Sequence, residues 1–442
     1  MEFLSVNIQM SKRKNKKPGI AIVDLLLAYP PKGGAGVDLF NNFSRLSHKF
    51  EIKIFGIRFT EQPQNASHDF QRGIIEKTPP LDYAMIDIMP DEKRDDIVRK
   101  IHKHVSEWKP DLVFVADGWT LKPYLIKELS RTFSTIVRLY AYEMLCPRNN
   151  QKWLGDRKCA NNALDDCSKC LACAREYADI VRKSRNGENN PLTFEASLAD
   201  IWRGDYCRVL SETVRNSHFI VYNSITADIL KKHGCLSVTR IPGAVAPDEF
   251  APSPEKNTDG KGFHIVVCGR MDDRAKGASV AIEAGRILKA KGFDIRMTVT
   301  SQKKHDYEWL NETGWLPQTE IIKLLNSADC ALVPSLWEEA FGMTWVEAMS
   351  MKVPVIAGRT GGPAEYIQDT INGLLAEPGS AEDFAEKISL LYNSYPLREK
   401  LSENGRKFVE KYFTWDISAD MLEELIRKII SENGGRKNQS MD

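Results

Sequence analysis

No apolar run in this chain of 442 residues approaches the roughly 20 residues that a membrane-spanning helix needs. The net charge is +1, so the composition gives no electrostatic sign of a nucleic-acid partner. The start, MEFLSVNIQMSKRKNKKPG, places its charged residues after its apolar ones, the reverse of a secretory signal. We therefore expect a cytoplasmic protein with no nucleic-acid partner.

The basic run KRKNKK indicates a disordered tail over residues 1–17. Peripheral contact with the inner face of a membrane is its second interpretation, because basic tails are attracted to anionic lipid. Disulfides are not expected either. A chain without an export signal should keep most of its nine cysteines as thiols or metal ligands.

A length of 442 residues exceeds what one hydrophobic core usually supports, so we expect two domains. Short apolar runs alternate with segments of helical periodicity over 18–245 and again over 263–412. This alternation predicts two α/β domains, each with a doubly wound parallel sheet. Residues 246–262 are rich in Pro, Gly and polar residues and are the expected linker. A helix is expected over 413–433, followed by a disordered tail over 434–442.

The stretch CALVPSLWEEAFGMTWVEAMSM (330–351) joins a predicted buried strand to a predicted helix through a loop. Glu339 lies in the loop, Gly342 permits a close backbone approach, and Glu347 lies on the helix. The start of such a helix offers unpaired N–H groups and a positive dipole end, which bind anions. Two doubly wound domains leave a cleft at their strand ends, and we expect these groups to face it. Alone, two acids at this spacing would more often belong to an ordinary surface.

A second loop strengthens the functional interpretation. CGRMDDRAKG (268–277) follows the first predicted strand of the second domain and carries Arg270 and Lys276. A guanidinium fork and an ammonium on one loop suit a diphosphate leaving group. Arg and Lys are common in exposed loops. A basic loop and a helix start at the same sheet edge, however, together indicate a binding site.

These motifs resemble the donor-binding half of the retaining family 4 glycosyltransferases of GT-B fold. The resemblance is carried by GRMDDRAKG, PSLWEEAFGMTWVEAM, VPVIAGRTGGPAEYI and INGLL, which lie between residues 268 and 375. PKGGAG near the start and RIPGAVAPDEF before the linker agree more loosely. FTWDISADMLEELIRKII resembles the family's C-terminal helix, which returns to brace the N-terminal domain.

The resemblance implies transfer of a sugar from a nucleoside-diphosphate sugar with retention of anomeric configuration. The acceptor would be a carbohydrate, a lipid-linked sugar or a small molecule, in polysaccharide, glycolipid or glycoconjugate synthesis. It further implies that Arg270 and Lys276 bind the donor diphosphate, that Glu339 contacts the donor sugar, and that Glu347 binds the ribose. Further donor contacts are implied for Lys32, Gly33, Gly34, Phe341, Gly342, Met343 and Thr344. The resemblance also implies that catalysis needs no metal cofactor, because fixed positive groups would stabilise the leaving diphosphate.

Three features depart from the family pattern. A His usually follows the strand that reads TIVRLYAYEMLCP here, and the polar groups available instead are Tyr140, Tyr142 and Glu143. The segment TVTSQKK (298–304) stands where a Gly-rich turn is usual, so no contact to the nucleotide base is carried over. The stretch 146–173 is an insert that the core fold does not need.

The insert contains five cysteines. The last four, Cys159, Cys167, Cys170 and Cys173, form C-x7-C-x2-C-x2-C, a spacing typical of zinc ligands. An iron–sulfur cluster uses similar spacing. We expect a structural metal here, because four thiolates leave no open position for catalysis; free thiols on a polar loop are the alternative.

Two other functions stay open. A dinucleotide- or metal-cluster-dependent redox protein would use PKGGAG as its phosphate loop. That loop does not have the G-x-G-x-x-G spacing, and no ribose-binding acid is identifiable after the next strand. An epimerase or phosphorylase of GT-B fold is the other alternative, because the fold alone does not settle the chemistry.

Overall fold

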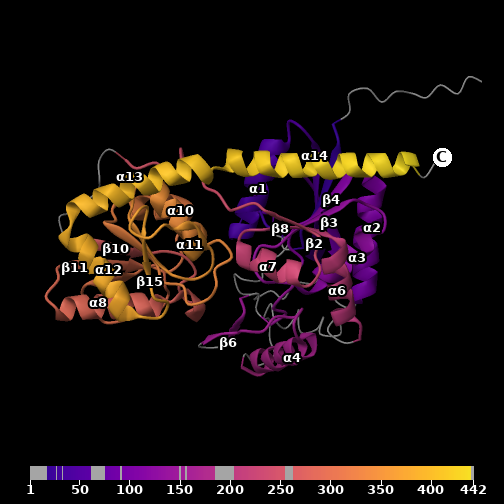
Figure 1. Ribbon diagram of the computed structural model, residues 1–442. Coiled ribbons are helices and arrows are strands. Elements are labelled where there is room, and N and C mark those ends of the chain that lie inside the picture. The colour runs from indigo at the N-terminus through magenta and orange to yellow at the C-terminus, as the bar shows by residue number, and fades with distance from the viewer. Residues whose placement is uncertain are drawn as a thin grey trace, which may run out of the picture.

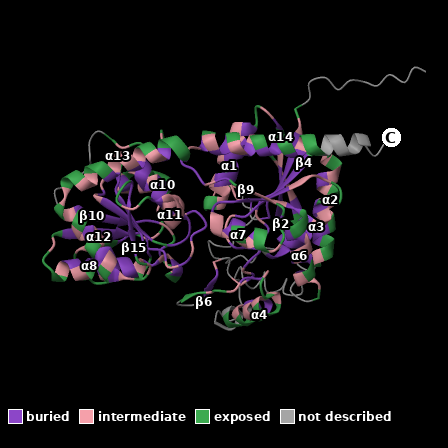
Figure 2. Ribbon diagram, in the orientation of Figure 1, coloured by how far each residue is buried: buried purple, intermediate pink, exposed green. Residues whose placement is uncertain are grey.

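The computed structural model describes residues 17–25, 27–31, 33–60, 75–89, 92–148, 151–154, 157–184, 204–253 and 262–439. It has two lobes side by side, each built on one parallel sheet (Figure 1). Buried residues concentrate in the two sheets, and the helices turn exposed residues outward (Figure 2). The expected architecture of two doubly wound α/β domains is therefore confirmed.

The first domain has a seven-stranded sheet in the order β3-β2-β1-β4-β5-β8-β9. Its strands are β1 Gly19–Val23, β2 Glu51–Phe59, β3 Asp82–Ile88, β4 Leu112–Val115, β5 Thr135–Arg138, β8 His218–Val221 and β9 Ser237–Arg240. Ile20 and Ile22 of β1 pack into one core cluster, and Ala21 and Val23 pack into another on the opposite face. An apolar run without alternation suits such a strand, because both of its faces are covered.

The apolar run 19–29 is longer than the strand that it forms, because β1 ends at Val23. The N–H of Leu25 donates to the carbonyl of Asp117 at 2.9 Å, so the chain leaves the sheet at this point. The helices that surround the sheet are α1 Gly34–Leu46, α2 Arg94–Trp108, α3 Lys122–Leu129, α4 Cys167–Ser184, α6 Tyr206–Asn216 and α7 Ser224–Lys232. Because α1 already begins at Gly34, only the first part of PKGGAG is a loop.

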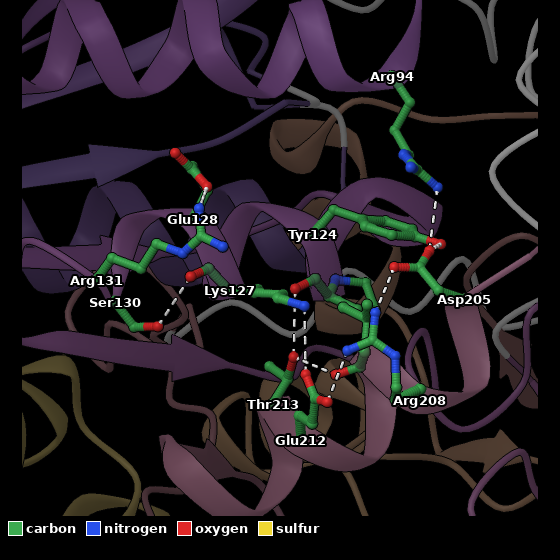
Figure 3. A network of polar contacts seen from close by, with 12 residues as sticks. Arg94, Tyr124, Lys127, Glu128, Ser130, Arg131, Asp205, Arg208, Glu212 and Thr213 are labelled. Atoms are coloured by element: carbon green, nitrogen blue, oxygen red, sulfur yellow. Dashed lines mark hydrogen bonds and ion pairs between the residues drawn. The ribbon is translucent and has the colours of Figure 1, made fainter.

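Polar contacts orient α2, α3 and α6 relative to one another (Figure 3). Asp205, which precedes α6, accepts a hydrogen bond from the Tyr124 hydroxyl at 3.3 Å and lies 3.5 Å from Arg94. Lys127 of α3 pairs with Glu212 of α6 at 3.3 Å. These side chains are partly exposed, so each pair contributes little to the stability of the fold. They set the position of α6, whereas the buried apolar residues beneath them supply the stability.

The second domain has a six-stranded sheet in the order β12-β11-β10-β13-β14-β15. Its strands are β10 Phe263–Val267, β11 Ile295–Val299, β12 Leu310–Glu312, β13 Cys330–Val333, β14 Val355–Gly358 and β15 Leu374–Ala376. Its helices are α8 Ala278–Ala290, α9 Gln318–Asn326, α10 Met343–Ser350, α11 Gly361–Tyr366, α12 Ala381–Asn393 and α13 Tyr395–Tyr412. In each sheet the strand order reverses beside the first strand, which is where ligands bind in open α/β sheets.

The chain crosses between the domains twice. The N–H of Val245 donates to the carbonyl of Phe413 at 2.8 Å, so the outgoing and returning segments cross side by side. Helix α14, Trp415–Gln439, then runs back along α1 of the first domain (Figure 1). Its apolar residues Ala419, Leu422, Leu425, Ile426 and Ile429 join the first domain's core. The expected returning helix is thereby confirmed.

That helix is longer than the sequence indicated. We expected it to end at residue 433, but its backbone stays helical to Gln439. Gly434 and Gly435 each lower helix stability by about 1 kcal/mol relative to alanine, which weakens a helix without ending it. The expected tail over 1–17 lies outside the described residues except for Lys17, and residues 254–261 of the expected linker lie outside them too. No described helix has the length and apolar character to cross a membrane.

A buried ion pair fixes the loop that follows β5. Lys122, at the start of α3, is fully buried, and its ammonium donates to Glu143 at 2.7 Å. The Glu143 carboxylate also accepts the backbone N–H groups of Tyr140 and Ala141. Burial alone would raise the pKa of Glu143, but the Lys122 ammonium and these donors hold it below its usual range. An ammonium at a helix start opposes the helix dipole, so Lys122 depends on this carboxylate.

Lys122→Met should therefore destabilise the protein by about 3–5 kcal/mol, because it leaves a buried carboxylate without its counter-ion. Urea unfolding at pH 7 measures the change. The double variant Lys122→Met/Glu143→Gln should recover part of the loss, since the remaining amide is uncharged. A single variant within about 1 kcal/mol of the parent would contradict this role for the pair.

Candidate active site

Loops that follow the carboxyl ends of both sheets meet at the interface between the domains. Gly33 and Gly34 of the first domain are exposed. A β-carbon on Gly34 would lie 3.6 Å from the Cγ of Met343, at the start of α10 in the second domain. The glycine loop therefore lies opposite α10. Lys32 lies outside the described residues.

The loop with Arg270 and Lys276 leaves the end of β10. Asp273 begins its short 3-10 turn by accepting the N–H of Ala275 at 3.0 Å. Gly277 closes the turn with φ +75°, and a β-carbon there would lie 2.0 Å from the carbonyl oxygen of Pro334. Only glycine permits this approach, which places the turn against the loop that follows β13. Arg270 at the start of the loop is exposed.

Lys276 reaches Glu339 across that contact. Its Nζ donates to Glu339 Oε1 at 2.6 Å, and the Ser335 hydroxyl donates to the same oxygen at 2.6 Å. Glu339 is only 4% exposed. The sequence placed Glu339 at the open mouth of a cleft; the structure instead buries it and pairs it with Lys276. The pairing follows from the cost of burying a lone carboxylate.

The backbone around Glu339 is held from both domains. Its carbonyl accepts the N–H of Gly362 at 2.7 Å, within the second domain. The next carbonyl, that of Ala340, accepts Nδ2 of Asn223 from the first domain at 2.7 Å. Asn223 is fully buried, and its Oδ1 also caps α7. Sequence reasoning missed Asn223, because its partner lies more than a hundred residues away.

Helix α10 begins beside the basic loop. Its N-cap, Gly342, has φ +82°, and Thr344 in the first turn approaches Gly269 of the loop. The side chain of Phe341 is 3% exposed and packs against aromatic rings, so only its backbone is available to a ligand. The structure thus brings together the helix start, Arg270 and Lys276, which were predicted to lie at one sheet edge.

Glu347 lies one turn further along α10, half-buried. Burial raises the pKa of its carboxyl to about 7. Among the described residues, no hydrogen bond or ion pair to this carboxylate is found. The neighbouring thiol of Cys268 has its pKa raised as well, by burial and then by Glu347. A carboxylate in this state is a strong hydrogen-bond acceptor for hydroxyl groups of a ligand.

The three polar groups available in place of the family's usual His differ in their surroundings. Glu143 is committed to Lys122 and two backbone N–H groups, as described above. Tyr142 is fully buried, with its ring 6.3 Å from that of Trp337. The hydroxyls of Tyr140 and Tyr142 are both buried, and neither has a hydrogen-bond partner in the part of the chain that the structure describes. Of the three groups, Glu143 is therefore the one already committed, and both tyrosines stay candidates.

The expected metal site at the cysteines is corrected in one respect. Cys167 forms a disulfide with Cys207 of α6, so it is not a metal ligand, and the expectation of no disulfide is wrong for this pair. Cys159, Cys170 and Cys173 are free thiols. Within the described ranges, no three His, Cys, Asp or Glu side chains are grouped to hold an ion. Spacing misled us because it compares only neighbours along the chain, whereas folding brings α6 to α4.

Residues 249–408 match the family model of glycosyl transferases group 1. The match falls on the second domain. An uncharacterised glycosyltransferase of Methanocaldococcus jannaschii is 30% identical over 207 residues, 47% of this chain and 52% of that protein. The capsular polysaccharide biosynthesis glycosyltransferase CapM of Staphylococcus aureus is 29% identical over 188 residues, 39% of this chain and 48% of that protein. The chain thus spans about half the length of the curated relatives it matches.

Solved structures resemble the whole chain. Sucrose-phosphate synthase from Thermosynechococcus elongatus has a TM-score of 0.65 at 16% identity and covers 94% of this chain and 100% of that one. The Anabaena protein HepE in complex with UDP-glucose has a TM-score of 0.63 at 14% identity and covers 93% of this chain and 99% of that one. These likenesses confirm the GT-B fold.

The raised pKa of Glu347 predicts that its carboxylate lowers the stability of the fold at high pH. A carboxyl whose pKa rises from 4.5 to about 7 on folding favours the folded state below pH 4.5 and loses this contribution as pH rises through 7. Glu347→Gln should therefore raise the melting temperature by about 2–4 °C at pH 8, and the gain should vanish near pH 4.5. Thermal unfolding across this range measures it.

If Glu347 binds the ribose hydroxyls of a donor, the same variant should bind nucleoside diphosphate about tenfold more weakly at pH 8, because an amide accepts fewer hydroxyl hydrogen bonds than a carboxylate. Glu320→Gln on α9 is the control, since that side chain is exposed and should change neither property. Stabilisation of the same size at every pH would show that burial of charge is not its cause.

Proposed function

We propose that this protein is a glycosyltransferase that moves a sugar from a nucleoside-diphosphate sugar to an acceptor with retention of anomeric configuration. The observation that carries the proposal is the Lys276–Glu339 pair beside Arg270 and the start of α10, all within the region that matches the group 1 model. The relatives named as glycosyltransferases and the HepE complex with UDP-glucose support a nucleotide-sugar donor.

Each group has a proposed part in the reaction. Arg270 and Lys276 bind the diphosphate and stabilise the negative charge that grows as it leaves. Glu339 orients Lys276 and contacts the donor sugar. Backbone N–H groups of Gly342, Met343 and Thr344, at the positive end of α10, complete the anion site. Glu347 accepts hydrogen bonds from the ribose hydroxyls.

The first domain would supply the acceptor side. Gly33 and Gly34 let its backbone approach the donor opposite Met343. The acceptor is proposed to be a carbohydrate, a lipid-linked sugar or a small molecule; the CapM relative, named for capsular polysaccharide biosynthesis, supports the first class. A screen of UDP-, GDP- and ADP-sugars for donor hydrolysis and transfer tests the function. An epimerase or phosphorylase would instead release an isomer or a sugar phosphate.

Arg270→Ala should lower turnover on the order of 10²-fold, because the guanidinium acts on charge that develops in the transition state. Its melting temperature should not change, since Arg270 is exposed. Lys276→Ala should lower turnover as much and also destabilise the protein, because it leaves the buried Glu339 carboxylate without its counter-ion. Steady-state kinetics and thermal unfolding separate the two effects.

EDTA should leave turnover nearly intact if these fixed cations stabilise the leaving group. A collapse of turnover in EDTA that Mg²⁺ or Mn²⁺ reverses would refute this account of the diphosphate site.

A further inference from the structure

The insert reaches from the first domain to the second at the candidate active site. Its hairpin consists of β6, Trp153–Leu154, and β7, Arg157–Lys158, and β6 lies on the side of the first lobe that faces the second (Figure 1). Lys152 and Lys158 both lie near the carboxylate of Glu338, with N–O distances of 3.8 and 3.6 Å. Nε2 of Gln151 donates to Asp273 Oδ2 at 2.6 Å.

The rest of the insert is fastened to the first domain. The disulfide Cys167–Cys207 joins α4 to α6. Asp165 pairs with Lys232 and His233 at the end of α7, at 2.7 and 2.8 Å. Leu171 and Ala174 of α4 are buried in the first domain's core. The hairpin therefore extends from a part of the insert that is fastened to the first domain. Residues that contact the hairpin are thereby held in place relative to that domain.

The two residues that the insert contacts belong to the two candidate donor loops. Glu338 directly precedes Glu339. Asp273 begins the 3-10 turn that ends at Lys276, and its own N–H donates to the carbonyl of Arg270 at 3.0 Å. The loops are also joined to each other, because the N–H of Leu336 donates to the carbonyl of Ala275 at 2.8 Å. The insert thus contacts both candidate donor loops, and these loops are bonded to each other.

Lys152 is an unusual residue for this position. It is 9% exposed, and its φ of +54° lies in the left-handed region that non-glycine residues rarely adopt. Both the buried ammonium and the backbone conformation cost free energy. Such strain occurs where the surrounding structure imposes a particular side-chain placement, often at a functional site. Here that placement brings the ammonium toward Glu338.

The contacts are too weak to hold two domains together. Ion pairs of this length with partly exposed partners change an equilibrium by about fivefold or less. The domains are already joined by two chain crossings and by Asn223. An effect of this size is, however, enough to change how often a loop occupies its reactive position.

We propose that Gln151, Lys152 and Lys158 are positioning residues, through which the insert holds Glu338 and Asp273 so that Glu339, Lys276 and Arg270 face the first domain. The proposal rests on the proposed function, because it takes these two loops as the donor site. It gives the insert a role in turnover that needs no bound metal.

The first test uses kinetics. Lys152→Met/Lys158→Met and Glu338→Gln should each lower kcat for sugar transfer about three- to tenfold, while the Kd for free nucleoside diphosphate stays within about twofold. The triple variant should be no slower than Glu338→Gln, because the lysines act through that carboxylate. Lys158→Arg should keep the parent rate. Lys323→Met, which breaks a matched Lys–Glu pair on α9, should also keep it.

The second test does not depend on enzymatic activity. Amide hydrogen exchange in peptides covering 270–277 and 336–342 should become about three- to tenfold faster in Lys152→Met/Lys158→Met, and exchange over 318–326 should not change. Unchanged exchange in both loops would overturn the proposal. So would a triple variant whose loss of kcat equals the product of the losses in Lys152→Met/Lys158→Met and Glu338→Gln. If the parent protein transfers no sugar from any donor, the proposed function fails, and hydrogen exchange alone then decides the role of the insert.

Discussion

The ion pair between Lys276 and Glu339 is the interaction on which the candidate site depends. A carboxylate that is 4% exposed requires a counter-charge, and Lys276 is the cation that reaches it. The pair forms only if the turn after β10 and the loop after β13 lie against each other, which Gly277 allows. Because the pair is charged and shielded, it keeps the ammonium oriented without solvent rearrangement. Such preorganisation is what stabilisation of a leaving anion requires.

The loop with Glu339 also belongs to the cores of both domains. Trp337 packs in the first domain's core cluster together with Tyr142 and Trp153. Phe341, four residues later, lies in a cluster of the second domain and stacks on Tyr222 of the first at 5.8 Å. A short segment that is buried in two cores therefore helps to fix how the two domains are placed relative to each other.

Buried charge recurs on the first-domain side of the interface. Arg138 at the end of β5 donates to Asp38 of α1 at 2.8 Å, and the Tyr222 hydroxyl donates to the same carboxylate at 3.0 Å. The Arg138 guanidinium also lies 4.0 Å from the centre of the Tyr222 ring. Tyr222 is the residue that stacks on Phe341, so this network supports the contact between the domains. Buried networks of this kind specify one arrangement because each partner is costly to leave alone.

The sequence by itself determined the alternation of strands and helices, because local periodicity records which faces are covered. It also predicted Arg270, Lys276, Glu339 and Glu347 as site residues, because the motifs that carry them are short and continuous. The tertiary structure decided the rest: that Lys276 pairs with Glu339, that Cys167 joins Cys207, and that the insert reaches Glu338. Each of these contacts joins residues about forty or more positions apart, and no local pattern encodes which distant partner a side chain meets. The burial that gives Glu347 its raised pKa is likewise a property of the packed fold, since an unfolded chain would leave the same carboxyl in water.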